Sequence, residues 1–208
     1  MNPLGSVLRI VLVAVMVATA HAADQPPDVM IRSVTDEVLK IVRDDRAILS
    51  GDAVRAAELV EGKVLPRFDF QRMTALAVGR DWRVATPAQQ ERLVELFRSL
   101  LVRTYSNALT QYKGQSIEFV PLRLRDEDVR TTVRAQIRQP GAQSIGLDFR
   151  VEKGTDGWKV YDIVVAGASL VTNYRGSFSQ VVRLHGLDGL IRSLEEKHRE
   201  VAAGVVRS

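Results

Sequence analysis

The chain has 208 residues, with 29 lysines and arginines against 25 aspartates and glutamates, and it contains no cysteine. The absence of cysteine excludes a disulfide framework, a thiolate metal site and a cysteine nucleophile. The net charge of +4 is small, and charges of both signs alternate along the chain instead of forming the one-sided basic stripe that nucleic-acid binding calls for.

The N-terminus carries the features of a secretory signal. One basic residue, Arg9, precedes an apolar run from Ile10 to Ala20, which is about half of the roughly 20 residues that a membrane-spanning helix needs. Ala20-His21-Ala22 then supplies an A-x-A cleavage sequence. We therefore expect residues 1–22 to be a signal peptide cleaved after Ala22 for export by the Sec pathway, with no permanent membrane anchor. An uncleaved N-terminal anchor is the less favoured alternative.

The rest of the chain, residues 23–208, fits a single domain large enough to bury a core. Its first part predicts three helices from apolar residues at helical spacing. The first covers residues 28–49 and ends at Ser50-Gly51, the second covers residues 52–64 and ends before Pro66, and the third covers residues 68–78 and ends at Gly79.

The clearest predicted helix follows Thr86 and extends to about Tyr112. Thr86 is a predicted N-cap, Pro87 stands at the first helical position, and Gln89 completes a capping box. One side of this helix is apolar and the opposite side is charged, so one face is expected to be buried. The apolar side consists of Leu93, Leu96, Phe97, Leu100, Leu101, Tyr105, Ala108, Leu109 and Tyr112.

From Ser116 the apolar period changes to two, which predicts three to four antiparallel strands joined by turns at residues 126–127, 140–141 and 154–157. Along the second strand, Val133 and the residues two and four positions away from it on either side face one way. Arg130, Arg134 and Arg138 face the other. This alternation indicates a sheet with one covered face. The fourth strand, residues 158–165, has apolar residues at both odd and even positions, so either of its faces could be the inner one.

Helical spacing returns after Gly167, with Ser169 as the predicted N-cap and Gly186 separating two final helices. Helices, antiparallel strands and helices in this order predict an α+β fold, with N-terminal and C-terminal helices packed on an antiparallel sheet of about four strands. The apolar stripes alone leave two alternatives open, a closed core or a cavity between helices and sheet.

The sequence offers few candidate catalytic groups. Only His185 and His198 remain outside the signal peptide, both near apolar stripes at helix ends, where a histidine usually packs or complements the helix dipole. Ser169 lacks the surroundings of a nucleophile elbow and is better explained as a helix cap. The acidic run at residues 126–128 lacks the glycine and distal glutamate of a calcium loop, so an acidic turn is favoured.

The arginines of the second strand allow two interpretations. They could bind anionic head groups or an acidic partner, or they could form cross-strand ion pairs with Asp148 and Glu152, which is the favoured reading.

Several motifs, in order, resemble the MlaC (toluene-tolerance) family of periplasmic phospholipid-binding proteins. The first signature is carried by residues 65–70, 75–79 and 85–90, the second by residues 158–162 and 167–171 with Asn173-Tyr174-Arg175, and the third by residues 186–190. The similarity covers about residues 28–196. One departure is Ala166, where the family often has an acidic residue, so a carboxylate has no role there.

The resemblance implies a soluble periplasmic shuttle that carries phospholipid between an outer-membrane lipoprotein complex and an inner-membrane ABC transporter, and so maintains outer-membrane lipid asymmetry. It implies no catalytic residue, cofactor or metal, and it favours an apolar cavity between the helices and the sheet. A hopanoid carrier, a small enzyme or a chaperone on a similar scaffold are the alternatives.

With the apolar stripes, the resemblance identifies candidate lipid-binding residues on both the helices and the sheet. They are Leu76, Phe97, Leu100, Leu101, Tyr105, Leu109, Val133, Ile137, Leu147, Phe149, Trp158, Tyr161, Leu170, Tyr174 and Phe178.

Overall fold

The structure is a computed structural model that describes residues 25–139 and 141–202. The predicted signal peptide and its cleavage after Ala22 lie outside these residues. Within the described ranges, no helix is both long enough and apolar enough to cross a membrane.

The N-terminal part contains more helical breaks than predicted. It consists of α1 (Pro27–Asp44), α2 (Arg46–Leu49), α3 (Ala53–Leu59), the π-helical turn η2 (Val60–Val64) and the 3₁₀ turn η3 (Leu65–Arg67). The single helix predicted over residues 28–49 is divided at Asp45, whose carboxylate accepts hydrogen bonds from the amides of Ala47 and Ile48 at 3.0 and 3.2 Å. Such a side-chain cap competes with continuation of the helix, although the apolar spacing passes through it unchanged.

The middle helices are α4 (Phe70–Val78), the 3₁₀ helix η4 (Gly79–Val84), α5 (Pro87–Tyr105) and the 3₁₀ helix η5 (Ser106–Gln111). The capping box of Thr86 and Gln89 at the start of α5 is confirmed. The predicted end at Tyr112 is wrong, because α5 ends at Tyr105 and the chain tightens into η5. Ser106 and Asn107 are weak helix formers, and apolar spacing barely distinguishes 3.6 from 3.0 residues per turn over so short a segment.

The sheet has five antiparallel strands in the order β1-β2-β3-β4-β5. Four correspond to the predicted strands, and the fifth is a two-residue strand before the last helix. Their bounds are β1 Ser116–Phe119, β2 Arg130–Arg138, β3 Ile145–Gly154, β4 Gly157–Val165 and β5 Ala168–Ser169. The predicted faces of β2 are confirmed, since Val133 and Ala135 are buried while Arg130, Arg134 and Arg138 are exposed.

The last described element is α6 (Leu170–Ala202), which is interrupted at Gly186, where φ is +69°. The predicted separation of two helical segments at this glycine is confirmed. A left-handed backbone angle of this kind costs glycine little and other residues more, because glycine lacks a Cβ atom.

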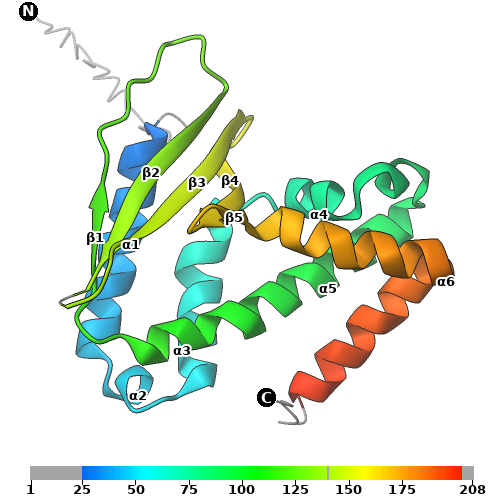
Figure 1. Ribbon diagram of the computed structural model, residues 1–208, viewed down its shortest axis with the longest axis horizontal. Helices are drawn as coiled ribbons and strands as arrows, with labels where there is room; N and C mark the ends of the chain where they lie inside the picture. The colour runs from blue at the N-terminus through cyan, green and yellow to red at the C-terminus, as the bar shows by residue number, and fades with distance from the viewer. Residues whose placement is uncertain (1–24, 140, 203–208) are drawn as a thin grey trace, which may run out of the picture.

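Helices pack against one face and one edge of the antiparallel sheet, which confirms the α+β class. In Figure 1, α1 runs along one face of the strands, whereas α4, α5 and α6 gather beyond the far edge of the sheet, next to β4 and β5. The largest core cluster joins α4, α5 and α6, and two smaller clusters lie along α1. The candidate site lies between these two smaller clusters.

Candidate functional site

An apolar cavity of about 200 Å³ lies between α1 and the face of the sheet that α1 covers. Residues from seven helices and strands, together with Phe68, surround it, and no aspartate or glutamate is among them. The lining residues are Ile31, Val34, Thr35, Val38, Leu39, Val64, Arg67, Phe68, Leu109, Ile117, Phe149, Val160 and Ile163.

Packing at the two ends of α1 holds this cavity open between them. Near the start of α1, Met30 and Ile31 are buried against the sheet residues Val133, Val151 and Trp158. Near its end, a second cluster packs α1 against α2 and α3 and consists of Val38, Val42, Ile48, Ala56 and Leu59. The middle turns of α1 lie between these clusters and face the cavity.

A β-bulge in β4 directs two residues to the cavity that would lie on opposite faces of a regular strand. Arg150 of β3 pairs with Asp162, but the next residue, Val151, pairs with Val160, so Tyr161 is the extra residue on β4. An inserted residue reverses which face the following side chains point to. Val160 and Ile163 therefore both line the cavity, although a regular strand would direct them to opposite faces.

The other face of β4 is fastened to the start of α6 through Asp162, which is only 2% exposed. Its carboxylate accepts hydrogen bonds from the Ser169 hydroxyl at 2.7 Å and the Val171 amide at 3.1 Å, and pairs with Arg150 at 3.1 Å. Ser169 in turn accepts a bond from the Thr172 amide at 3.1 Å. The predicted N-cap role of Ser169 is thereby confirmed. Both carboxylate oxygens of Asp162 accept hydrogen bonds that hold β4 to β3 and to α6.

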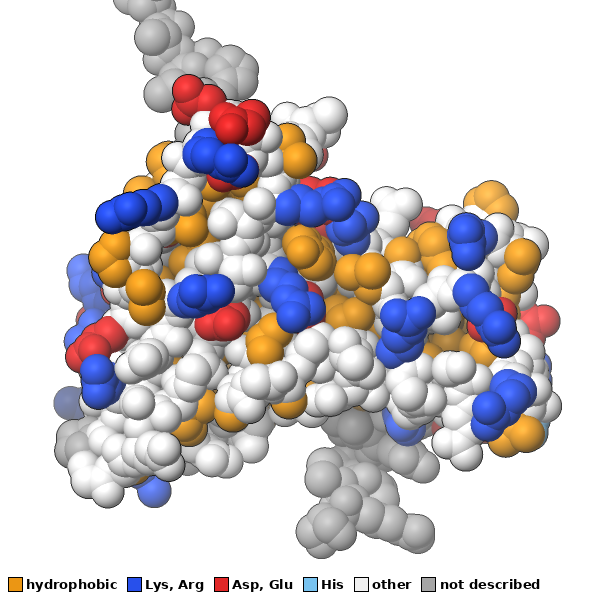
Figure 2. All heavy atoms as spheres, turned by 45° about the horizontal axis from the view of Figure 1, so that its top comes forward, with side chains coloured by type: hydrophobic (Ala, Val, Ile, Leu, Met, Phe, Trp, Pro, Cys, Tyr) orange, Lys and Arg blue, Asp and Glu red, His pale blue; other side chains and the backbone are white. Residues whose placement is uncertain are grey.

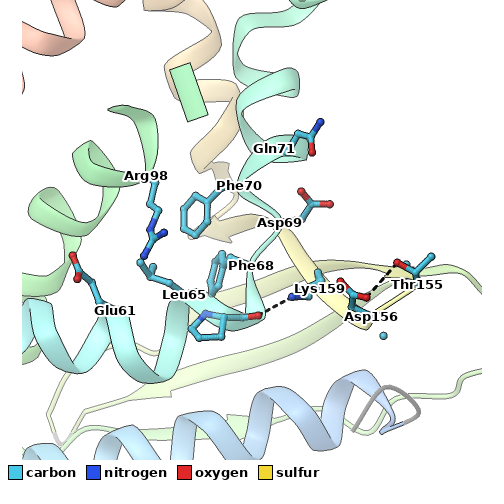
Figure 3. Close-up of a pocket in the computed structure, with 13 residues that line it drawn as sticks. Glu61, Leu65, Phe68, Asp69, Phe70, Gln71, Arg98, Thr155, Asp156 and Lys159 are labelled. Carbon is cyan, nitrogen blue, oxygen red and sulfur yellow. Dashed lines mark hydrogen bonds between the residues drawn. The ribbon is translucent and has the colours of Figure 1, made fainter. Parts of the chain in front are cut away.

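A second pocket, of about 600 Å³ and mixed polarity, lies beside the apolar cavity. Phe68 belongs to the lining of both. In Figure 3 the rings of Phe68 and Phe70 lie next to each other, and Arg98 extends toward them from α5. The two ring centroids are 5.9 Å apart, and Lys159 donates a hydrogen bond to the Pro66 carbonyl at 2.9 Å.

The structure distributes the sequence-predicted site residues among several places. Two of them, Leu109 and Phe149, line the apolar cavity. Val133 and Trp158 are buried between α1 and the sheet, Ile137 and Leu147 are on the face of the sheet that carries Phe149, and Tyr105 is 47% exposed. The others lie in the cluster formed by α4, α5 and α6: Leu76, Phe97, Leu100, Leu101, Tyr161, Leu170, Tyr174 and Phe178. Lipid contact by these residues stays a prediction.

Sequence reasoning missed the contribution of α1 to the cavity. Val34, Thr35 and Leu39 were placed on a predicted helix, but nothing in an apolar stripe distinguishes a wall of a cavity from a packed core. Arg67 was missed because it ends a short turn without periodicity, and Phe68 was missed because the sequence predicts it at the start of a helix, whereas its backbone is extended. A weak signal was available, since Thr35 interrupts an apolar stripe and Arg67 stands between an apolar turn and an aromatic pair.

Two of the three arginines on the exposed face of β2 form cross-strand ion pairs. Arg130 pairs with Glu152, as predicted, whereas Arg138 pairs with Glu118 of β1. On the face seen in Figure 2, Lys and Arg side chains are scattered among acidic and apolar ones and do not form one stripe.

The acidic turn after β1 is held by its own arginine. Arg125 bonds the Asp128 carboxylate at 2.8 Å, and this interaction holds the pKa of Asp128 below its usual value. Among the described residues, no group of three or more histidine, cysteine, aspartate or glutamate side chains is placed to bind a metal ion.

Comparison with known proteins gives a consistent result over most of the chain. The sequence profile of the MlaC protein family matches residues 32–196. A protein of Haemophilus influenzae named as the intermembrane phospholipid transport system binding protein MlaC is 24% identical over 194 residues, which cover 92% of this chain and 91% of that protein. The toluene tolerance protein ttg2D of Pseudomonas putida is 25% identical over 187 residues, covering 88% of this chain and 86% of that protein.

A solved structure agrees with the sequence matches. The phospholipid-binding protein from Ralstonia solanacearum, determined in complex with a phospholipid, has 35% sequence identity and superposes with a TM-score of 0.79. The match covers 86% of this chain and 99% of that one. Because the family profile spans most of the sequence and the fold agrees with a close structural relative, the chain belongs to the MlaC family.

Proposed function

We propose that this protein is a periplasmic carrier that binds phospholipid and moves it between the outer membrane and an inner-membrane ABC transporter. The apolar cavity between α1 and the sheet is the observation that carries this proposal. It is supported by the relative from Ralstonia solanacearum, whose structure contains a phospholipid, and by the relative from Haemophilus influenzae, which is named for intermembrane phospholipid transport.

The apolar lining suits a carrier energetically. Each methylene group gains about 0.8 kcal/mol when it leaves water, so two chains of roughly 15 methylenes would lose on the order of 24 kcal/mol if they were released into water. A bilayer and an apolar cavity both restore this free energy. A carrier therefore needs a cavity that approaches the solvation of the membrane, and many weak apolar contacts meet that requirement.

The size of the cavity implies that the protein opens to bind its lipid. Its volume of about 200 Å³ is below the roughly 300–1,000 Å³ typical of pockets for small ligands. The cavity lies between the two clusters that fasten α1, so outward displacement of the middle of α1 enlarges it. We expect amides of the middle turns of α1, around Val34 and Leu39, to change their hydrogen-exchange rates when the delipidated protein is loaded with phospholipid.

We further propose that the protein is not an enzyme. The Ser169 hydroxyl donates to the Asp162 carboxylate, and both groups accept hydrogen bonds from amides in the first turn of α6. These bonds give both groups a structural role. Incubation with phospholipid is therefore expected to leave the lipid chemically unchanged, and hydrolysis that Ser169→Ala abolishes would contradict this part of the proposal.

Solvent extraction of the protein after mild purification from the periplasm tests the main proposal. We expect phospholipid at about one molecule per chain by native mass spectrometry, and transfer of that lipid to acceptor vesicles. Recovery of a hopanoid would identify another cargo, and recovery of bound polypeptide would favour a chaperone. Protein that carries no lipid before any delipidating step would refute the proposal.

A further inference from the structure

An ion pair joins α1 to η2 at the edge of the apolar cavity. The Lys63 ammonium of η2 lies 2.6 Å from the Glu37 carboxylate of α1, and α1 and the helical segment formed by α3 and η2 run side by side (Figure 1). Each partner directly precedes a residue that lines the cavity, because Val38 follows Glu37 and Val64 follows Lys63. The two side chains are 46% and 48% exposed, so the pair lies on the solvent side of the cavity wall.

Polar links between α1 and the rest of the fold are scarce. Within residues 25–139 and 141–202, α1 forms no other ion pair, and no side-chain hydrogen bond joins it to another element. The Arg32 guanidinium lies over the Phe119 ring at 4.6 Å, which belongs to the cluster near the start of α1. Besides apolar contacts, one ion pair therefore holds the middle of α1 to the opposite wall of the cavity.

The segment that carries Lys63 is itself unusual. The Leu65 amide donates to the Val60 carbonyl, five residues back, which makes η2 a π-helical turn. Such turns are rare and are often found at functional sites. No residue of η2 is buried, so little packing fixes this turn. A shift of η2 relative to α1 therefore disturbs few contacts other than the ion pair.

We propose that the Glu37–Lys63 ion pair is a latch that controls how fast lipid enters and leaves the cavity, an inference that rests on the proposed function. Outward displacement of the middle of α1 separates it from η2 and breaks the pair. The latch closes over an empty and a loaded cavity alike. Its loss therefore speeds loading and release together and leaves the affinity for lipid unchanged. Salt weakens the attraction between exposed charges, so it favours the open latch.

Transfer of a fluorescent phosphatidylcholine tests this inference with the full chain. Loading is followed from donor vesicles to delipidated protein and release from loaded protein to acceptor vesicles, all made of phosphatidylcholine, which has no net charge. We expect Glu37→Gln to raise both rates about 2- to 5-fold at low salt, the range that corresponds to an exposed ion pair. High salt should speed the wild type and leave Glu37→Gln unchanged. The double variant Glu37→Lys/Lys63→Glu restores the pair in reverse and should return both rates toward those of the wild type.

A covalent tether tests the same movement directly. The chain contains no cysteine, so introduced thiols react without background. In Glu37→Cys/Lys63→Cys, a short bismaleimide joins the two positions in place of the ion pair. Because a tethered α1 opens poorly, we expect loading and release to slow about 10-fold or more relative to the same variant without the reagent. The single variant Glu37→Cys, treated identically, should keep its untreated rates.

Glu118→Gln is the matched control. It removes one carboxylate from the Arg138–Glu118 ion pair, whose side chains are 52% and 59% exposed. Its neighbour Ile117 lines the cavity, and successive side chains of a strand point to opposite faces, so Glu118 points away from the cavity. This variant is expected to load and release lipid as the wild type does. Circular dichroism verifies that each variant is folded.

The outcomes separate the latch from the proposed function. Folded Glu37→Gln that exchanges lipid at the wild-type rates overturns the latch and leaves lipid carriage intact. Equal acceleration in Glu118→Gln also overturns it, because the effect would then come from net charge. A cross-linked variant that exchanges lipid as fast as its untreated form overturns it too, since the cavity would open elsewhere. Failure of the wild type to take up lipid refutes the proposed function itself.

Discussion

Phe97 and Phe149 are a pair of aromatic residues through which stability and lipid binding can be separated. Phe97 is fully buried in the cluster of α4, α5 and α6. Its ring meets those of Tyr174 and Phe178 edge-on, with centroids 5.0 and 5.3 Å away. Removing a fully buried ring costs about 3–5 kcal/mol, and the lost edge-to-face contacts place Phe97→Ala in the upper part of that range.

That loss is a large part of the roughly 5–15 kcal/mol of a typical domain, so the milder Phe97→Leu serves where Phe97→Ala fails to fold. We expect Phe97→Leu to lose about 1–2 kcal/mol of unfolding free energy and to retain its lipid. The free energies come from urea unfolding followed by circular dichroism. The protein is first delipidated, because a ligand that binds only the folded state adds to its apparent stability.

Phe149 differs because its side chain is partly buried and lines the apolar cavity. Phe149→Asn places an amide without a partner where an acyl chain would lie, and an unsatisfied amide of this kind costs about 1–3 kcal/mol. Phospholipid affinity is therefore expected to fall about 5- to 150-fold. If folded Phe97→Leu loses its lipid while Phe149→Asn keeps it, the acyl chains lie among α4, α5 and α6, and the placement in the cavity under α1 is refuted.

Three further measurements examine the scaffold. Ser169→Ala is expected to lower the unfolding free energy by about 1 kcal/mol through loss of the helix cap, with lipid transfer intact; a collapse of transfer in the folded variant would contradict the structural role of this serine. Gly186→Ala is expected to cost about 1–3 kcal/mol in urea unfolding, because a left-handed backbone at φ +69° strains any residue with a Cβ atom, and an unchanged midpoint would argue against that geometry. Burial, together with Tyr105, raises the pKa of Tyr174 to about 12, so its stabilising contribution is complete below pH 10 and is lost as pH rises through 12. The ultraviolet absorbance difference between wild type and Tyr174→Phe should therefore titrate near pH 12, and titration near 10 would contradict the burial.

Local signals in the sequence predicted much of this fold correctly. Thr86, Pro87 and Gln89 specify the start of α5, Ser169 caps α6, and Gly186 interrupts it. These predictions succeed because capping and left-handed backbone angles depend on a few adjacent residues. The inner face of β2 was equally predictable, because alternation with period two requires no knowledge of what covers the sheet.

The sequence motifs were sufficient to predict the family, but they did not predict where the cavity lies. An apolar stripe has the same pattern whether its partners fill the space opposite it or leave a gap. The long stripe of α5 packs tightly against α4 and α6, whereas the shorter stripe of α1 spans an opening between two packed clusters.

Only the tertiary structure decided which residues meet at the cavity. The bulge at Tyr161 reverses the parity of β4 and brings Val160 and Ile163 to the same side, which no periodic reading of an apolar strand could show. Arg67 reaches the cavity because its turn is fixed by the bridge between Phe68 and Val160, some 92 residues apart in the chain. Local propensity determines where helices and strands begin and end, whereas a cavity is a property of how distant segments fail to fill the space between them.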